Sequence, residues 1–362
     1  MTATATPDRA APGPALPRCL VLLLGTASAV VTVAGLKAMA WLIAPVLLAL
    51  VIVIVLSPVH KYLREHGFRT WAATLVLVLL IYGILVAFSL VVIVSLAKLA
   101  ALVPQYTDRV RALATTAADA AGRLGVRPGG LREAASSMDL GKVLTSLGGL
   151  LGDVAGLTTS VVFLLALLLF FSVEANGIDT RLADIDGDRP QIRVALGGFA
   201  CRTRRYLAVA TVFGLIVAVA DTVALAWLGI PLSVLWGLLS FVTNYIPNIG
   251  FVLGLLPPAL LGLLGSGWQR MVAVIVVYVL INFVAQSVIQ PRYVGDAVGL
   301  STALTFLSLV FWAWVLGPLG VLLAVPATLL VMAVLVDVDP AAGWAAALLR
   351  APPKRAGEVT TG

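Results

Sequence analysis

Three amide side chains recur four residues apart near the end of one apolar segment. Asn282, Gln286 and Gln290 lie at positions i, i+4 and i+8, which stacks them along one face of a helix. Lipid cannot satisfy such a face, so we expect it to point into the protein. Two roles are open: hydrogen bonds that hold helices together, worth about 0.6 to 2 kcal/mol each, or the lining of a polar pathway.

A second polar group interrupts a stretch without any charge, residues 230–265. As one helix this stretch would reach about 54 Å, whereas the hydrocarbon core of a bilayer is about 30 Å thick. Proline and glycine in its middle break a helix, and the backbone groups that they free need protein or a polar cavity around them. Such breaks often form the binding site of a transporter. The residues at this break are Asn244, Tyr245, Pro247, Asn248 and Gly250.

Asp221 is the only acidic residue deep in a predicted span. A charged carboxylate there costs at least about 2.5 to 3.5 kcal/mol on insertion scales. Because burial disfavours the charged form, Asp221 could bind a proton or a sodium ion. The alternative is an uncharged, hydrogen-bonded aspartate near the outer end of a short span. We add Asp221 to the candidate substrate or ion pathway formed by the amides and Tyr245.

The sequence contains no recognisable catalytic motif. His60 and His66 fall in one loop and lack the H-E-x-x-H pattern of zinc proteases, and the sequence has no G-x-S-x-G or P-loop motif. Cys19 and Cys201 have neither metal-ligand nor disulfide spacing. We therefore expect no enzymatic activity, no metal and no cofactor. Transport would have to run on an ion gradient or downhill.

The elements that carry these residues must be membrane helices. Hydrophobic residues make up 61% of the 362 and charged ones 11%, with a mean hydropathy of +1.07, whereas soluble domains are roughly 25% charged. Many of the basic residues behind the net charge of +7 sit in short loops beside apolar stretches, so we expect no nucleic-acid partner. The prediction is an all-α, polytopic membrane protein with about eight spans. The apolar stretches are residues 19–36, 39–56, 71–96, 155–173, 206–228, 230–265, 271–290 and 300–336.

The beginning of the chain has two interpretations. Residues 1–17, rich in Ala, Pro and Thr, are typical of a disordered tail. The apolar stretch 19–36 has basic flanks and Ala27-Ser28-Ala29, an acceptable signal-peptide cleavage site. An equally apolar stretch, 39–56, follows almost at once. We expect the two stretches to form a helical hairpin, which favours a retained first span.

The orientation follows from Lys and Arg in short loops, which tend to be cytoplasmic. Residues 57–70 carry three basic side chains apart from histidine, and residues 174–205 carry six Arg. We therefore expect both segments in the cytoplasm, the second as a loop or amphipathic helix, and the segment 96–154 outside. The transporter domain is assigned to residues 18–336, and a cytoplasmic tail to residues 337–362.

The segment 96–154 has an apolar pattern of its own. Two stripes alternate by three and four residues, as in a heptad repeat, and Arg127-Pro128-Gly129-Gly130 separates them. The pattern predicts a helical hairpin packed on its own body or, as the alternative, a contact between copies of the chain. The stripes are Val103, Tyr106, Val110, Leu113, Ala117, Ala120 and Leu124, then Leu140, Leu144, Leu147, Leu151 and Val154.

The second half of the chain repeats itself. The span 206–228 precedes a long apolar stretch broken at Pro247, and the span 271–290 precedes another, broken at Gly317 and Pro326. If each long stretch folds back as a hairpin, the two units enter the membrane from opposite sides and form an inverted repeat. Two long, tilted, kinked spans are the alternative.

Several motifs in this half resemble those of the autoinducer-2 exporter family of permeases. The segment 244–250, then Gln290-Pro291-Arg292-Tyr293-Val294-Gly295, then Gly317-Pro318-Leu319-Gly320 with Ala324-Val325-Pro326, occur in the order and spacing of that family. The resemblance covers about residues 19–336. Its structural motif residues are Pro247, Gly250, Pro291, Gly295, Gly317, Pro318, Gly320 and Pro326.

The resemblance implies an inner-membrane protein with about eight spans and cytoplasmic N- and C-termini. It also implies export of small solutes or, as in some members, exchange of sodium for protons, by a secondary or facilitated mechanism. The expected partners are the lipid bilayer, a small-molecule or ion substrate and further copies of the chain in a homo-oligomer. The alternative is a non-transporting membrane scaffold whose intramembrane amides are structural.

Overall fold

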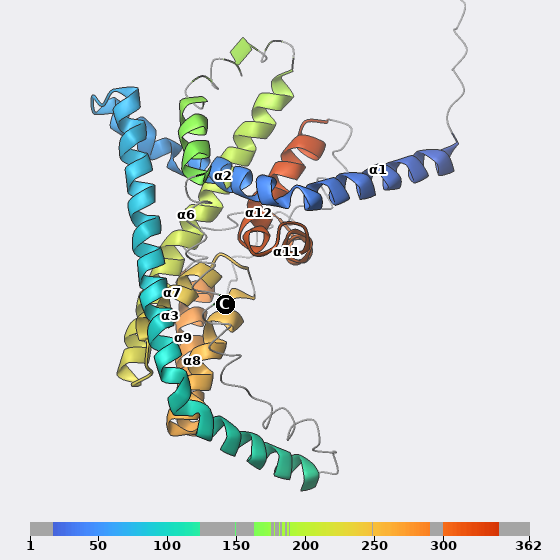
Figure 1. Cartoon of the computed structure of the whole chain (residues 1–362). Helices are drawn as coiled ribbons and strands as arrows, with labels where there is room; N and C mark the ends of the chain where they lie inside the picture. The colour runs from blue at the N-terminus through green and yellow to red at the C-terminus, as the bar shows by residue number, and fades with distance from the viewer. Residues whose placement is uncertain are drawn as a thin grey trace, which may run out of the picture.

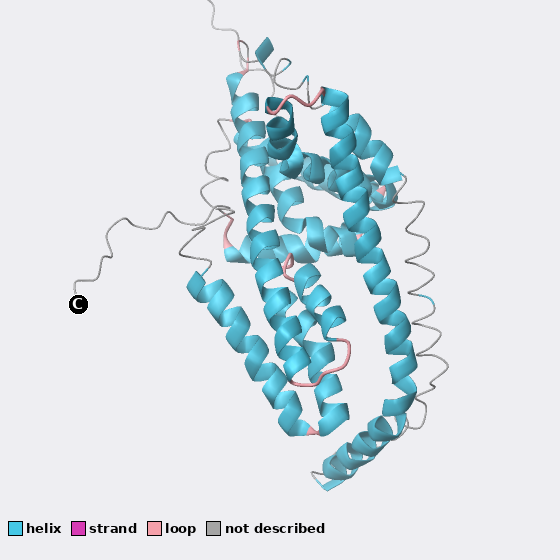
Figure 2. Cartoon of the chain, turned by 90° about the vertical axis from the view of Figure 1, so that its left-hand side faces the viewer, coloured by secondary structure: helices cyan, strands magenta, loops and turns pink. Residues whose placement is uncertain are grey.

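The computed structural model describes residues 17–123, 163–174, 189–247, 249–289 and 300–339, with isolated positions between 149 and 187. Almost all of these residues are helical (Figure 2). The predicted all-α, polytopic membrane fold is therefore confirmed. Five of the described helices are long and apolar enough to cross a membrane: Ala40–Glu65, Trp71–Tyr106, Pro190–Trp227, Trp268–Gln286 and Pro318–Asp337.

Helices α1 (Arg18–Ala38) and α2 (Ala40–Glu65) run end to end (Figure 1). Only Met39 separates them, and helical hydrogen bonding continues across it. The Met39 N–H donates to Gly35 O at 3.0 Å, and the Ile43 N–H donates to Met39 O at 2.9 Å. The predicted hairpin of the first two apolar stretches is thus wrong, because the junction consists of helix-forming residues and contains no proline or glycine turn.

Helix α3 (Thr70–Arg123) is a single helix of 54 residues. It continues through residue 96, where the sequence predicts the end of a span. Pro104 lies inside it, and the lower part of α3 runs at a marked angle to the rest (Figure 1). Proline removes a backbone hydrogen bond and is a common cause of such bends. The first apolar stripe is therefore helical, whereas the predicted break and the second stripe lie outside the described residues.

A short helix, Phe163–Glu174, and α6 (Pro190–Trp227) come next. Pro190 occupies the first turn of α6, where its missing N–H is not needed. The helix unites the last part of the basic segment 174–205 with the predicted span 206–228. In its middle, Arg204 Nε donates to Ile54 O at 3.1 Å and Arg204 Nη2 to Ser57 Oγ at 2.7 Å. These contacts fasten α6 to the end of α2.

The stretch 230–265 folds back on itself as two helices, α7 (Ser233–Thr243) and α8 (Gly250–Ser266). Helix α7 returns along α6, so that Gly237 faces Ala218. Helix α8 in turn packs against α7, with Gly254 facing Ser240. One long kinked span is therefore ruled out, and we call this pair the first hairpin.

The stretch 300–336 also folds back, as α11 (Thr302–Leu316) and α12 (Pro318–Met332). Between them Gly317 has φ +69°, a conformation that favours glycine. The Trp312 Nε1–H donates to Thr328 Oγ1 at 3.0 Å across the two helices. We call this pair the second hairpin, and its turn contains the predicted motif residues Gly317 and Pro318.

Each hairpin is associated with a helix that ends in π-helical geometry. Helix α9 (Trp268–Asn282) follows the first hairpin and continues into the π-helix η1 (Phe283–Ile289). Helix α12 continues into the π-helix η2 (Ala333–Asp337). Short π-helical segments are frequent at functional sites.

Helices α6 and α9 run in opposite directions. Asp221 of α6 and Tyr278 of α9 line one cavity, whereas Asn244 bonds both Ala210, earlier in α6, and Gln286, beyond α9. Each of these helices precedes a hairpin along the chain. The helices that precede the two hairpins are thus antiparallel, as an inverted repeat requires.

The turn of the first hairpin packs onto the second hairpin. Ile246 belongs to the same buried apolar cluster as Trp312 and Leu316 of α11 and Leu47 of α2. This cluster therefore joins both hairpins and α2 into one body.

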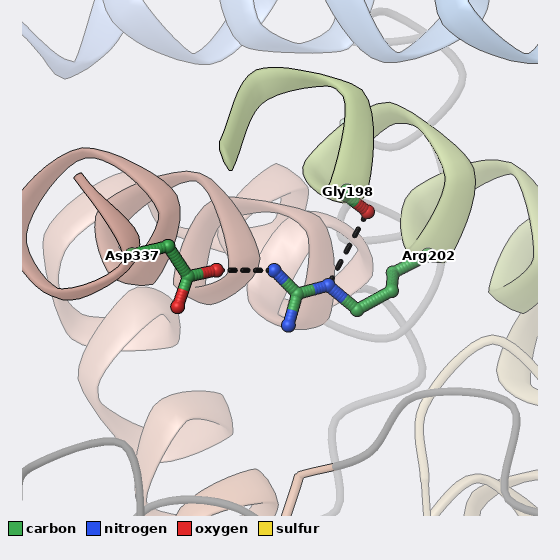
Figure 3. A network of polar contacts seen from close by, with 3 residues as sticks. All are labelled: Gly198, Arg202 and Asp337. Carbon is green, nitrogen blue, oxygen red and sulfur yellow. Dashed lines mark hydrogen bonds and ion pairs between the residues drawn. The ribbon is translucent and has the colours of Figure 1, made fainter. Parts of the chain in front are cut away.

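An ion pair fastens the end of the second hairpin to α6. Arg202 Nη2 lies 2.5 Å from Asp337 Oδ2, and Arg202 Nε donates to Gly198 O at 3.3 Å (Figure 3). The two charged side chains are only 25% and 10% exposed. Arg202 and Arg204 thus connect the same part of α6 to η2 and α2.

Candidate functional site

The turn of the first hairpin, residues 244–249, is held from α6 by three side-chain contacts. The Tyr206 hydroxyl donates to Tyr245 O at 2.7 Å, and Asn244 Nδ2 donates to Ala210 O at 3.2 Å. The hydroxyls of Thr211 and Tyr245 lie 2.7 Å apart. The Tyr206 hydroxyl therefore satisfies one carbonyl of the turn, and protein groups of this kind are what an irregular segment at membrane depth requires.

Three of the predicted amides form a hydrogen-bonded chain beside this turn. Gln286 Nε2 donates to Asn282 Oδ1 at 3.0 Å and, at 3.4 Å, to Asn244 Oδ1. Asn282 Nδ2 donates to Tyr278 O at 3.0 Å. The chain links α9 and η1 to the hairpin turn, while the Gln286 side chain stays exposed. Both readings of the amides thus have support: they hold helices together, and part of their surface is open to a ligand.

A small polar cavity adjoins the amide chain between α6, α7, α8 and α9. Asp221, which the sequence places deep in a predicted span, is 0% exposed and lines this cavity. Neither oxygen of the Asp221 carboxylate has a hydrogen-bond partner among the described residues. The residues around the cavity are Val217, Asp221, Ser240, Thr243, Asn244, Gly250, Phe251, Gly254, Tyr278 and Asn282.

The structure brings most of the described candidate residues into one region. Asp221, Asn244 and Asn282, which come from three separate segments, line the same cavity. Gln286 bonds Asn244 and Asn282, and Tyr245 follows Asn244 in the turn. Of the motif residues, Pro247 is half-buried, and Gly250, Gly320 and Pro326 are buried. Asn248, Gln290, Pro291 and Gly295 lie outside the described residues.

Sequence reasoning missed the hydroxyl groups of the site. Ser240 and Thr243 of α7 are buried beside Asp221, and the Ser240 hydroxyl donates to Tyr278 Oη at 3.4 Å. The sequence nevertheless carried a pattern that points to Tyr278 and Ser240. Tyr278 continues the four-residue spacing of Asn282 and Gln286 by one step towards the N-terminus, and Ser240 precedes Asn244 by one helical step.

Two helical hairpins preceded by antiparallel helices, with a polar break inside a membrane fold, are an arrangement typical of secondary transporters. The family model of the AI-2E family transporter matches residues 26–338 of the chain. The chain therefore belongs to the AI-2E transporter family, a family of multi-pass membrane permeases.

Similarity to individual proteins agrees with this assignment. The chain is 31% identical over 317 residues to the AI-2 transport protein TqsA of Escherichia coli, covering 86% of this chain and 90% of that protein. It is 30% identical over 308 residues to the "Putative transport protein YhhT" of the same organism, covering 85% and 88%. A Haemophilus influenzae protein described as a "Putative transport protein" is 29% identical over 318 residues, covering 85% and 90%.

Proposed function

We propose that the chain moves small polar solutes across the membrane by a secondary or facilitated mechanism, along a pathway at the turn of the first hairpin. The observation that carries the proposal is the amide chain of Asn244, Asn282 and Gln286, which spans the hairpin turn, α9 and η1 and ends on an exposed side chain. An amide offers both donors and an acceptor, so this chain suits a hydroxylated or carbonyl-bearing solute. Tyr245, Asn248 and Gln290 are further candidates for the pathway.

For the substrate and the direction of transport, the proposal draws on the relatives of the chain. The name of TqsA specifies AI-2, and we propose export of a solute of that class by this chain. Exchange of sodium or protons is the second activity that the buried Asp221 favours, since an ionisable residue buried inside a membrane protein commonly marks an ion pathway. Hydrogen bonds within the amide chain favour the alternative, a scaffold whose amides only join helices.

We propose a location in the bacterial inner membrane with the basic segments 57–70 and 174–205 and the C-terminus in the cytoplasm. Because α1 and α2 run end to end, a single crossing by this pair would leave the N-terminus on the opposite side. Arg204 contacts the end of α2, so the two basic segments, 57–70 and 174–205, meet at one end of the molecule. Arg109 of α3 donates to Leu264 O at 2.8 Å at the other end. A homo-oligomer is part of the proposal because α1 leaves apolar side chains exposed for lipid or a second copy, Val30 and Val31 among them.

Flux into proteoliposomes tests the pathway. We expect Asn282→Leu with Gln286→Leu to abolish flux of AI-2 and of other small hydroxylated solutes while expression and particle size stay unchanged. Gln269→Leu is the matched control, because it removes an exposed amide at the other end of the same helix. It should keep wild-type flux.

A different result would favour the scaffold. If the double variant aggregates while Gln269→Leu is well folded, the amides are structural. If the double variant folds and transports as fast as the wild type, the proposed pathway is wrong.

A further inference from the structure

Asp221 is the only charged residue among the fully buried side chains of the described chain. Its exposed fraction is 0%, and both carboxylate oxygens lack a hydrogen-bond partner among the described residues. Ser240 lines the same cavity as Asp221. An ionised carboxylate in such a place is unfavourable unless a cation or proton neutralises it.

The polar side chains that share the cavity with Asp221 all carry an oxygen atom that could bind a cation, and the rest of the wall consists of apolar residues and glycines. The hydroxyls of Ser240, Thr243 and Tyr278 line the cavity with it, as do the side chains of Asn244 and Asn282. Lys, Arg and His are absent from the cavity wall among the described residues. Among the described residues of the cavity wall, the charge of Asp221 therefore has no compensating side chain, and the Tyr278 phenol is the only other titratable group.

Size and charge restrict what the cavity can hold. It has room for about 10 Å³ of a water-sized occupant, which is close to what one water molecule needs. Oxygen ligands suit hard cations. A single carboxylate neutralises one positive charge, so a monovalent ion leaves the buried site neutral whereas a divalent ion would leave an unpaired charge.

We propose that this cavity is a binding site for one dehydrated sodium ion, held by the Asp221 carboxylate together with the oxygens of Ser240 and Tyr278. The ion would join α6, α7 and α9 at one point. Asn244 and Asn282 belong both to this cavity and to the amide chain. Occupancy by sodium therefore fixes the position of the hairpin turn, and this consequence rests on the proposed transport function, although the binding itself does not.

Sodium binding to the purified full-length protein in detergent tests the site. We measure radioactive sodium by scintillation proximity, and thermal stability in sodium chloride against choline chloride at equal ionic strength. The wild type should bind sodium saturably and gain thermal stability from it. Asp221→Asn should lose both effects, and Ser240→Ala should bind about tenfold more weakly or worse.

Two variants serve as controls. Glu65→Gln removes an exposed carboxylate at the end of α2 and should bind sodium as the wild type does. Gln286→Leu removes an amide that is not part of the cavity wall and should lose flux but keep sodium binding. The experiment can therefore contradict the proposed amide pathway and the proposed sodium site independently of each other.

The variant Asp221→Asn has nearly the same shape as the native residue and removes the charge, so in choline chloride it should be at least as stable as the wild type. A wild-type protein without saturable sodium binding overturns the proposal, including one whose stability responds to pH alone, as a simple proton site would. Sodium binding that survives Asp221→Asn overturns it as well.

Discussion

The turn of the first hairpin needs a residue without a side chain at position 250. A Cβ on Gly250 would lie 1.8 Å from the carbonyl oxygen of Thr243 and 2.6 Å from its carbon. These are backbone atoms, which can move away only if the turn opens. We therefore expect Gly250→Ala to destabilise the protein by about 1 to 3 kcal/mol or more and to abolish flux, as measured by thermal unfolding in detergent and in proteoliposomes.

Gly83→Ala is the matched control for this substitution. Gly83 lies within α3, and a Cβ there would meet nothing within 4 Å. Alanine in an open helical position should stabilise by about 0.5 to 1 kcal/mol, with flux unchanged. Equal stabilities of the Gly250→Ala and Gly83→Ala proteins would contradict the tight turn.

Among the residues of the candidate site, the sequence identified the amide side chains better than the hydroxyl groups. The regular spacing of Asn282 and Gln286 put both on one face, and the structure joins them by a hydrogen bond. Asp221 stood out because charge is rare in a span. Ser240 and Tyr278 were passed over although each lies four residues from an amide, because serine and tyrosine are ordinary in apolar helices. The packing of α7 against α6 and α9 brings them to the carboxylate.

The sequence predicts well where the helices lie but poorly at which residues they begin and end. Apolar stretches identified where helices lie, but α3 continues past residue 96 and α6 begins well before residue 206, because a helix does not stop where the chain leaves lipid. The two hairpins follow strong breaks, with Pro247 and Gly250 in one and Gly317 in the other. Where no such break exists, at Met39, the predicted hairpin does not form.

The ion pair between α6 and η2 should hold the second hairpin in place. Arg202 and Asp337 lie 2.5 Å apart with little exposure (Figure 3), so their attraction is less screened than on a surface. We expect Arg202→Gln and Asp337→Asn each to lower thermal stability, and the double variant to lose less than the two losses added together. The difference, about 0.5 to 3 kcal/mol, measures the coupling.

A double-mutant cycle by thermal unfolding provides this number. Glu65→Gln, at an exposed i,i+4 pair with Lys61, should change stability by less than about 1 kcal/mol. Strictly additive losses at positions 202 and 337 would mean that the two side chains do not act on each other.

The molecule as a whole has basic segments at one end and the bent part of α3 at the other. The loop between α2 and α3 and the first part of α6 both lie in the upper part of Figure 1, and the lower part of α3 lies at the opposite end. Arg109 fastens that lower part to the last carbonyls of α8, Leu264 O and Gly265 O, which suits the negative end of a helix. The long axis thus separates two chemically different ends.

This separation leads to a test of the orientation by single-cysteine labelling in whole cells. In a background without Cys19 and Cys201, we introduce Thr116→Cys on the lower part of α3 and Asp184→Cys within the basic segment 174–205; both positions are exposed. Because Lys and Arg favour the cytoplasmic side, an impermeant maleimide should label Thr116→Cys in intact cells and Asp184→Cys only after permeabilisation. Labelling of Asp184→Cys in intact cells, with Thr116→Cys protected, would mean that the chain is inserted the other way round and that the proposed direction of export is reversed with it.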